Sequence, residues 1–297
     1  MPRRVATVFT SLVILLAGPA TAMALNINES YRPQDEFKLD PWFSVGPIEF
    51  NKAVFYVIVA TFLTCFTMVY AARRMQERPN RLQTVVEGAY TLMRDNITRG
   101  NMPDKMAATW FPFISTIFLF LWFSNIIGYI PLPTNTEHKV DIFGAHIPSF
   151  ALYAATANLS VPLVLTLMVW FSYHFVGIRA KGFIPYLKGW IPAGVEGPAR
   201  IPIFFIEVIS HFVRLVSLSV RLFANILAGH LLILFMGGGL VVLLNLAVAG
   251  SVVLGLVTGT MAVAFYLFEV GLVATLQAFI FATLTAIYLG GAVAAEH

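Results

Sequence analysis

Long apolar stretches, separated by short polar connections, dominate this chain of 297 residues. Hydrophobic residues make up 58% of the sequence and charged residues only 11%, and the mean hydropathy is +0.79. A soluble domain carries about 25% charged residues, whereas a helix that crosses a bilayer needs about 20 apolar residues in a row. The sequence therefore predicts an all-α polytopic membrane protein with five membrane helices.

The apolar runs place three spans of ordinary length before two longer ones. We expect the first three at residues 53–70, 108–130 and 149–173, and the last two at residues 203–236 and 258–290. At 1.5 Å per residue, the helix over 203–236 would be about 50 Å long, beyond the roughly 30 Å of bilayer hydrocarbon. A helix of this length must tilt strongly, bend or lie partly along the interface. We expect the last two spans to be long and strongly tilted, with a break at the glycines Gly237, Gly238 and Gly239.

Basic residues collect in two of the connections. The first connection carries Arg73, Arg74, Arg78, Arg81, Arg94, Arg99 and Lys105, and the second carries Arg179, Lys181, Lys188 and Arg200. The positive-inside rule places both in the cytoplasm, so the mature N-terminus lies outside and the C-terminus inside. Residues 82–97 mix apolar and charged positions, as in an amphipathic helix on the membrane surface. The net charge of +4 is explained by these connections and does not indicate nucleic-acid binding.

The first 24 residues resemble a secretory signal. Arg3 and Arg4 precede an apolar run over residues 5–17, and the small residues Ala22 and Ala24 suit cleavage. An uncleaved extra helix is the alternative. With the signal removed, residues 25–297 form a single membrane domain, and the signal favours the plasma membrane of a bacterium over an organelle.

Arg221 lies in one of the most apolar parts of the chain. The nearest carboxylate in sequence is that of Glu207, fourteen positions back. An arginine at the centre of a membrane helix costs roughly 2.5–3.5 kcal/mol on insertion scales, and its guanidinium stays charged. Such a group is either held in a structural ion pair or used in function.

Other polar side chains share helix faces with Arg221 or lie on the next helix. At 100° per residue, one stripe about 80° wide contains Glu207, His211, Arg214, Arg221 and Asn225. His230 points about 140° away from Glu207, toward a different neighbour. On the last helix, Tyr266, Gln277 and Tyr288 recur every eleven residues and would align within about 40°, with Glu269 beside them.

Structural roles compete with functional ones along these stripes. Glu207, His211 and Arg214 are spaced to form ordinary pairs within one helix. Asn225 and Gln277 could merely bridge helices. A counter-charge for Arg221 could come from Glu269 or from another subunit. Glu269 and His230 are titratable groups inside a membrane, as in proton relays.

The sequence Ser217-x-Ser219-x-Arg221-Leu222-Phe223-Ala224-Asn225-x-x-Ala228-Gly229-His230 resembles the hallmark helix of subunit a of F-type ATP synthases. The stretch from Leu276 to Phe281, together with Leu284-Thr285-x-x-Tyr288-Leu289, resembles the last helix of that family. Ser124-Asn125-Ile126-Ile127-Gly128, and Ile201-Pro202 through Glu207, resemble its other marks. The similarity extends from about Phe50 to the C-terminus.

The resemblance implies a stator subunit packed against a rotating ring of subunit c, with two half-channels leading from opposite faces to the ring. Arg221 would attract the ionised ring carboxylate and block a proton leak between the half-channels. Asn225 and Gln277 would be its polar partners, His230 a titratable group on the entry side, and Glu207 a carboxylate near the cytoplasmic exit. Ser217, His211, Arg214, Tyr266 and Tyr288 would support them. The other implied partners are the subunit b stalk and the remaining ATP synthase subunits.

Two positions depart from the family pattern. The position of His230 is a glutamate in some members, so the proton carrier there differs among them. Glu269 lies eight residues before Gln277, whereas the family would place its titratable group seven residues before, at Val270. One residue turns a helix face by about 100°.

No motif in the sequence indicates bond chemistry. It has no phosphate-binding loop, no Ser-His-Asp set and no metal-ligand spacing, and Cys65 is the only cysteine. We therefore expect no cofactor, no metal and no catalysis by this chain itself. The alternatives are a self-contained secondary transporter in which Arg221 binds an anion, and a structural membrane subunit with buried pairs. Transporters often contain inverted repeats, and no internal repeat is evident here.

Overall fold

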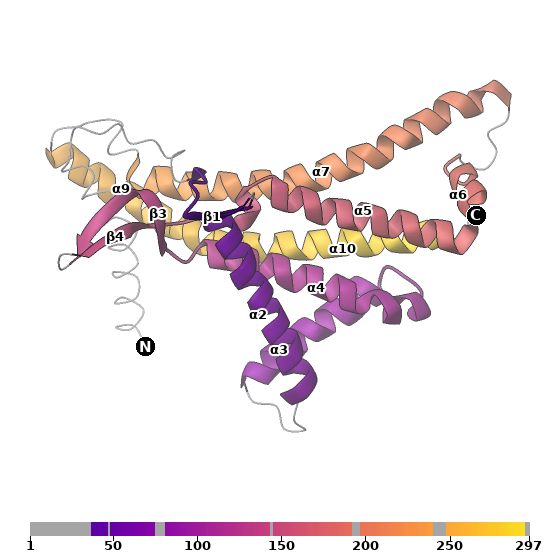
Figure 1. Ribbon diagram of the computed structural model, residues 1–297, viewed down its shortest axis with the longest axis horizontal. Helices are drawn as coiled ribbons and strands as arrows, with labels where there is room; N and C mark the ends of the chain where they lie inside the picture. The colour runs from indigo at the N-terminus through magenta and orange to yellow at the C-terminus, as the bar shows by residue number, and fades with distance from the viewer. Residues whose placement is uncertain are drawn as a thin grey trace. The chain divides into compact units, whose positions relative to one another are not determined.

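The computed structural model describes residues 37–46, 48–74, 81–142, 145–191, 197–239 and 248–294 (Figure 1). The proposed signal peptide, residues 1–24, lies outside the described residues. The long helices are α2 (Lys52–Arg74), α4 (Asp104–Gly128), α5 (Ser160–Lys181), α7 (Arg200–Leu234), α9 (Val248–Phe268) and α10 (Ala274–Val293). The short ones are α3 (Arg81–Thr91), α6 (Phe183–Lys188), the 3₁₀ turns η3 (Ala155–Ala157) and η4 (Gly197–Ala199), and the π-helical segments η2 (Leu92–Arg99), η5 (Phe235–Gly239) and η6 (Glu269–Val273).

Among the residues that the structure describes, five helical stretches are long and apolar enough to cross a membrane. They are Lys52–Arg73, Asp104–Gly128, Ser160–Lys181, Gly197–Gly237 and Gly250–Val293. The last two contain 41 and 44 residues, against 22 to 25 for the others. The prediction of an all-α polytopic membrane protein with five spans, the last two long, is therefore confirmed.

The predicted start of the third span is wrong. Residues 132–151 form an antiparallel hairpin of β3 (Leu132–Ile142) and β4 (Ala145–Ala151), and the helix begins only at Ser160. Residues 152–157 are apolar because they are buried in the protein. The Asn158 side-chain oxygen accepts a hydrogen bond from the Ser160 backbone N–H at 3.0 Å, a local bond that favours a turn before the helix.

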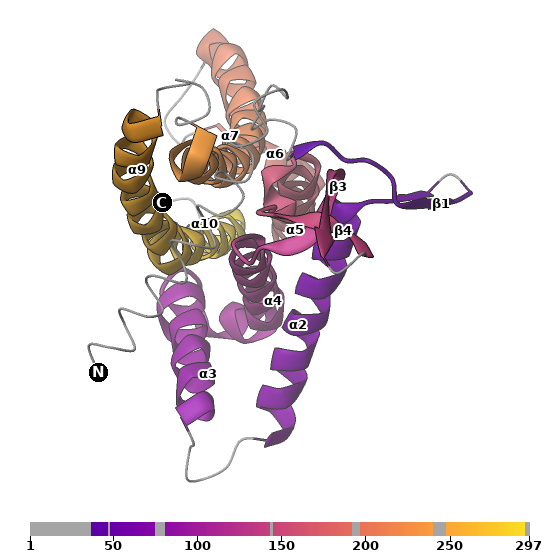
Figure 2. The same ribbon diagram turned by 90° about the vertical axis from the view of Figure 1, so that its left-hand side faces the viewer.

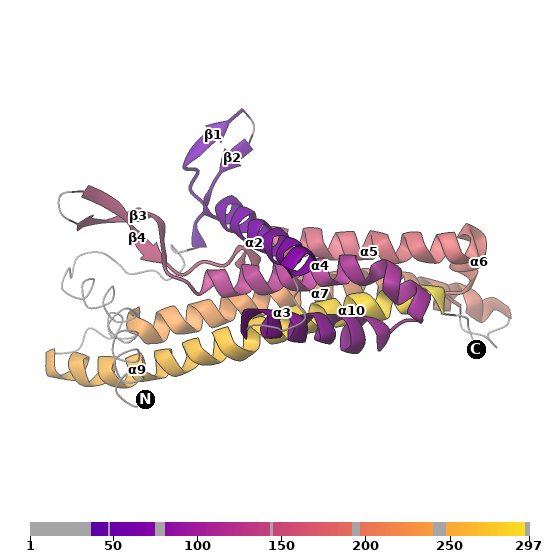
Figure 3. The same ribbon diagram turned by 90° about the horizontal axis from the view of Figure 1, so that it is seen from below.

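The boundaries of the two long helices also differ from expectation. The α-helix α7 ends at Leu234, three residues before the expected break at Gly237, because Phe235–Gly239 form the π-helical segment η5. Residues 240–247 lie outside the described residues, and α9 begins at Val248, ten residues before the expected start. Along the chain, α9 is followed directly by η6 and then by α10, as the ribbon in Figure 3 shows.

The basic connections are partly helical. The amphipathic segment expected over 82–97 is α3 followed by the π-helical η2, which together reach Arg99. The connection after α5 was expected to be irregular because of its glycines and prolines, yet it contains the short helix α6. Gly182, with φ at 85°, ends α5 in a left-handed conformation that favours glycine.

The chain divides into two compact units, each built from separate stretches of sequence. Unit 1 contains residues 1–57, 125–157 and 225–275, and unit 2 contains residues 58–124, 158–224 and 276–297. Unit 1 includes two antiparallel strand pairs, β3 with β4 and β1 (Phe43–Val45) with β2 (Ile48–Phe50). The two pairs are drawn apart from each other in Figure 2. Its core cluster is formed by Tyr129, Leu152, Ile233 and Ala274, with Tyr266 and Val270 packed against it.

Candidate functional site

The carboxyl group of Glu269 is buried in unit 1 and bonded to a tyrosine. The Glu269 side chain, at the start of η6, is 8% exposed. The Tyr129 hydroxyl, which follows the end of α4, donates a hydrogen bond of 2.9 Å to Glu269 Oε2. The Tyr129 backbone carbonyl in turn accepts a hydrogen bond of 2.8 Å from the Tyr266 hydroxyl. Tyr129 therefore connects two of the residues that the sequence singled out.

His230 lies against the other side of Tyr129. The two rings have their centroids 4.4 Å apart, and the imidazole is fully buried. Its Nδ1 lies 2.9 Å from the Ile226 carbonyl oxygen, and its Nε2 lies 3.1 Å from the Gly128 carbonyl oxygen. A neutral imidazole donates to only one of these acceptors, whereas the protonated ring donates to both. The site therefore has hydrogen-bond acceptors for either protonation state.

Gly229 provides the space that the Glu269 carboxyl group occupies. A Cβ at position 229 would lie 2.5 Å from the Glu269 Cδ and Oε2 and 2.7 Å from its Oε1. Such distances are far below van der Waals contact, so any larger residue would displace the carboxyl group. Two adjacent residues of α7 thus contribute to this cluster: Gly229 leaves room for the Glu269 carboxyl group, and His230 supplies the second titratable side chain.

The π-helical turn η6 accounts for the unusual spacing of Glu269. The Ala274 backbone N–H bonds to the Glu269 carbonyl, five residues back, where an α-helix would use four. One extra residue in this turn makes the spacing of eight from Glu269 to Gln277 equivalent to seven in a regular helix. The two then differ by about 20° along the helix instead of about 80°. The same turn removes the alignment expected between Tyr266 and Gln277, which assumed an uninterrupted α-helix.

Long-range bonds surround this turn. Asn125 of α4 is fully buried, and its side-chain N–H donates to the Ala274 carbonyl at 3.3 Å. The Asn125 side-chain oxygen accepts a 2.8 Å hydrogen bond from the Thr156 hydroxyl. The bond from Asn125 satisfies a backbone carbonyl at the end of the π-turn.

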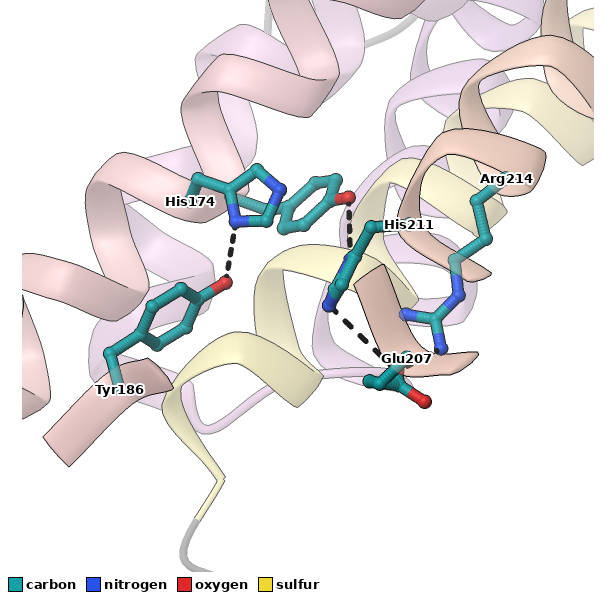
Figure 4. Close-up of polar contacts among 6 residues, drawn as sticks. His174, Tyr186, Glu207, His211 and Arg214 are labelled. Carbon is teal, nitrogen blue, oxygen red and sulfur yellow. Dashed lines mark hydrogen bonds and ion pairs between the residues drawn. The ribbon is translucent and has the colours of Figure 1, made fainter. Parts of the chain in front are cut away.

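In unit 2, the first part of the α7 stripe is paired. Glu207 Oε1 lies 3.1 Å from Arg214 Nη2 and 3.8 Å from His211 Nε2 (Figure 4). The Tyr173 hydroxyl of α5 lies 3.0 Å from His211 Nδ1, and the Arg214 guanidinium faces the ring of Tyr288 on α10 at 5.9 Å. The structural pairs considered for Glu207, His211 and Arg214 are therefore present.

Arg221 has no such pairing. Its side chain is exposed, as are those of Ser217 and Asn225 on the same helix. Within the part of the chain that the structure describes, no carboxylate lies within ion-pair distance of its guanidinium. Its exposed neighbours Val216 and Val220 are apolar. Gln277 on α10 is by contrast buried, at 5% exposure.

Apart from the buried Gln277, the predicted residues thus fall into two side-chain clusters and an exposed set. His230, Glu269 and Tyr266 meet around Tyr129, and Glu207, His211, Arg214 and Tyr288 meet around Tyr173. Sequence reasoning missed Tyr129 and Tyr173 as members of these clusters, because each lies on a helix or turn distant in sequence from its partners. A polar residue directly after the end of a span, as Tyr129 is, was the only signal. No group of three or more histidines, cysteines and acidic residues suited to a metal occurs among the described residues.

Comparison with known proteins identifies the family. The family model described as ATP synthase A chain matches residues 54–290. A relative from Rubrobacter xylanophilus, named ATP synthase subunit a, is 34% identical over 252 residues, or 84% of this chain and 86% of the relative. Proteins of the same name from Helicobacter pylori and Bradyrhizobium diazoefficiens are 36% and 33% identical, covering 82% and 89% of this chain and 90% and 98% of their own. The exposed arginine of α7 and the glutamine of α10 therefore lie in a chain that belongs to the ATP synthase A chain family.

Proposed function

We propose that this chain is the proton-translocating stator subunit of the membrane sector of an F-type ATP synthase. In this role it forms two half-channels to a ring of subunit c and couples proton flow to rotation of that ring and to ATP synthesis. Family membership supports the assignment to the ATP synthase complex. The chain itself carries out no bond chemistry, and the nucleotide sites belong to other subunits.

The observation that carries the proposal is the unpaired Arg221 on an exposed apolar strip. Exposed side chains on α7 include Phe212, Val213, Val216 and Val220, which lead up to the arginine. A fixed positive charge in apolar surroundings is strongly stabilised by an anion within about 4–6 Å. Because no carboxylate of the described chain supplies that anion, we propose that a ring carboxylate from another polypeptide does.

A charge placed in this way would also control the protonation of its partner. A nearby guanidinium favours the ionised form of a carboxyl group, so a ring carboxyl that reaches Arg221 releases its proton. The guanidinium itself does not release a proton at physiological pH, so it cannot pass one across the membrane. Arg221 would therefore drive deprotonation and separate the two half-channels at the same point.

The two clusters supply titratable groups for the half-channels. We propose that His230 and Glu269, connected through Tyr129, carry protons on the entry side, and that Glu207 carries them on the cytoplasmic side. The basic connections favour a cytoplasmic location for the Glu207 end and hence a C-terminus inside the cell. Asn225 and Gln277 would provide polar contacts near Arg221. A multi-pass location in a bacterial plasma membrane, next to the c-ring and the subunit b stalk, follows from this assignment.

A secondary transporter in which Arg221 binds an anionic substrate is the alternative. A transporter site lies at the midplane between repeats, enclosed by half-helices. The exposure of Arg221 on one face of a continuous helix, together with the family, favours a stator that meets its anion on a partner surface.

The decisive experiment replaces Arg221 by alanine in the assembled complex. We expect Arg221→Ala to abolish proton-driven ATP synthesis while the complex still copurifies with its c-ring. Arg221→Lys should also fail or work poorly, because an ammonium lacks the planar fork and loses its proton when desolvated. Normal synthesis by an assembled Arg221→Ala complex would refute the proposal.

A further inference from the structure

A buried aromatic cluster in unit 2 contains two histidines that differ in their surroundings. His174 lies on α5 and His211 on α7, with ring centroids 4.9 Å apart, and Trp190, just after α6, packs against both. His211 is within reach of the Glu207 carboxylate at 3.8 Å and of the Tyr173 hydroxyl at 3.0 Å. His174 Nδ1 contacts only the Tyr186 hydroxyl, at 2.8 Å, and its buried Nε2 has no hydrogen-bond partner among the described residues. His211 therefore connects two groups that can exchange protons, the Glu207 carboxylate and the Tyr173 hydroxyl, whereas His174 contacts only the Tyr186 hydroxyl.

On its other side, Tyr173 borders a small cavity. The cavity is lined by Tyr173 and Thr166 from α5, Arg214, Leu215 and Leu218 from α7, and Tyr288 from α10, together with Val169 and Trp170. The Tyr288 ring packs against Tyr173 with centroids 5.8 Å apart. Residues from three helices thus line a space next to Tyr173, the tyrosine that contacts His211.

These groups occupy successive positions along α7. At 1.5 Å per residue, His211 lies about 6 Å from Glu207 along the helix, and the cavity spans Arg214 to Leu218, about 10–17 Å from Glu207. Arg221 lies about 21 Å from Glu207 on the same helix. Along α7, the cavity-lining residues Arg214 to Leu218 and then His211 therefore lie between Arg221 and Glu207.

We infer that His211, together with Tyr173, carries protons between the cavity and Glu207, as an inner part of the cytoplasmic half-channel. The inference rests on the proposed function of the chain. His211 accepts a proton at Nδ1 from the Tyr173 hydroxyl and releases one from Nε2 to the Glu207 carboxylate. The Tyr173 oxygen takes its replacement proton from the cavity side. Rotation of the His211 side chain then turns the protonated Nδ1 toward Glu207, so that the next proton enters at Nε2.

The geometry around Glu207 suits this transfer. The 3.8 Å between His211 Nε2 and Glu207 Oε1 is longer than a hydrogen bond, so transfer needs a small side-chain rotation or one bridging water. Arg214, bonded to the same Oε1 at 3.1 Å, holds the carboxylate in place. Glu207 is partly exposed and His211 buried, at 31% and 8% of their side-chain areas, as expected for an outer and an inner carrier.

The test measures passive proton conductance of the membrane sector. It uses inverted membrane vesicles that carry the assembled ATP synthase, from which the catalytic sector is then removed. In these vesicles the Glu207 side faces the outer solution, whose pH is varied while the inner pH is fixed. We expect His211→Phe to lower conductance roughly tenfold or more, because general acid–base groups contribute at least that much. It should also remove the part of the dependence on outer pH that comes from a titrating imidazole, because phenylalanine cannot take up a proton.

His174→Phe is the matched control, since it removes an imidazole from the same aromatic stack but off the path. It should keep both the conductance and the pH dependence of the wild type. His211→Gln provides a second variant, because it retains a hydrogen-bonding group beside Tyr173 but cannot titrate. Wild-type conductance and pH dependence in either assembled His211 variant would overturn the inference, and so would equal losses in the His174 and His211 variants.

Arg221→Ala separates this inference from the proposed function. Loss of coupled proton pumping in Arg221→Ala, with wild-type behaviour in His211→Phe, would refute only the role of His211. Normal coupled pumping in Arg221→Ala would refute the proposed function itself.

Discussion

Replacing Gly229 by alanine tests whether the position of the Glu269 carboxyl group matters for proton transfer. The new Cβ would lie 2.5 Å from Glu269 Cδ and Oε2, whereas an ordinary contact begins at 3.4 Å. The carboxyl group must therefore retreat by about 0.9 Å. The hydrogen bond from Tyr129 is 2.9 Å long, so a retreat along its direction would stretch it beyond the 3.5 Å limit for a useful bond.

The expected effect follows from the loss of that bond. A hydrogen bond to a charged group is worth about 1.5–3 kcal/mol, and each 1.4 kcal/mol corresponds to a factor of ten. We therefore expect Gly229→Ala to slow ATP-driven acidification of inverted membrane vesicles by roughly 10- to 100-fold. Because alanine is about 1 kcal/mol better than glycine inside a helix, the helix itself should not be weakened.

Two further variants distinguish this cause from a general helix effect. Gly259→Ala, on α9, adds a methyl group where nothing lies within 4 Å, and it should pump at the wild-type rate. Gly229→Ala combined with Glu269→Asp shortens the carboxylate side chain and should recover part of the flux relative to Gly229→Ala alone. Wild-type acidification by Gly229→Ala, in complexes shown to assemble, would refute the role given to this contact.

Three other substitutions test neighbouring contacts. Tyr129→Phe removes the only hydrogen bond that the described residues donate to the Glu269 carboxyl and should slow vesicle acidification roughly tenfold; an unchanged rate would make that bond incidental. His230→Gln should slow the flux and flatten its dependence on pH, since the amide cannot titrate; a profile like that of the wild type would show that His230 serves only in packing. Thr156→Val leaves the Asn125 oxygen buried without its donor and should destabilise the subunit by about 1–3 kcal/mol, visible as a lower midpoint in thermal denaturation of the detergent-purified complex. An unchanged midpoint would show that Asn125 finds another donor.

The spans were predictable because their cause is local. A run of about 20 apolar residues has few alternatives to a membrane helix, and the sequence alone located all five. The same reasoning failed at the start of the third span, because residues 152–157 are buried in the protein and the helix begins only at Ser160. Composition does not distinguish burial in lipid from burial in protein, and a local turn at Asn158 decided the boundary.

The π-helical turn at Glu269 was beyond sequence reasoning for a different reason. The segment Glu269–Val273 contains no proline and no unusual residue pattern that predicts a change of helix type. Two side chains far away in sequence bond to the ends of this segment. The Tyr129 hydroxyl donates to the Glu269 carboxyl group, and the Asn125 side-chain N–H donates to the Ala274 carbonyl. Such bonds exist only once the helices have packed, so the offset of Glu269 remained unexplained until the structure was known.

The site was predictable in its residue types and less so in its connections. Periodicity placed Glu207, His211 and Arg214 on one face, where they do pair. Periodicity alone could not show that Arg221, on that same face, would be exposed while His211 is buried. The difference arises because side chains of α5 and α10 cover only the first part of the stripe.

The central claim is that the positive charge of Arg221 is met by a carboxylate of a different polypeptide. A density map of the assembled ATP synthase that resolves this side chain tests it most directly. We expect the guanidinium to face the rotor, with an ionised ring carboxylate within about 4–6 Å in at least one rotary state. A map in which Arg221 is paired with a carboxylate of its own chain, away from the rotor, would contradict the account.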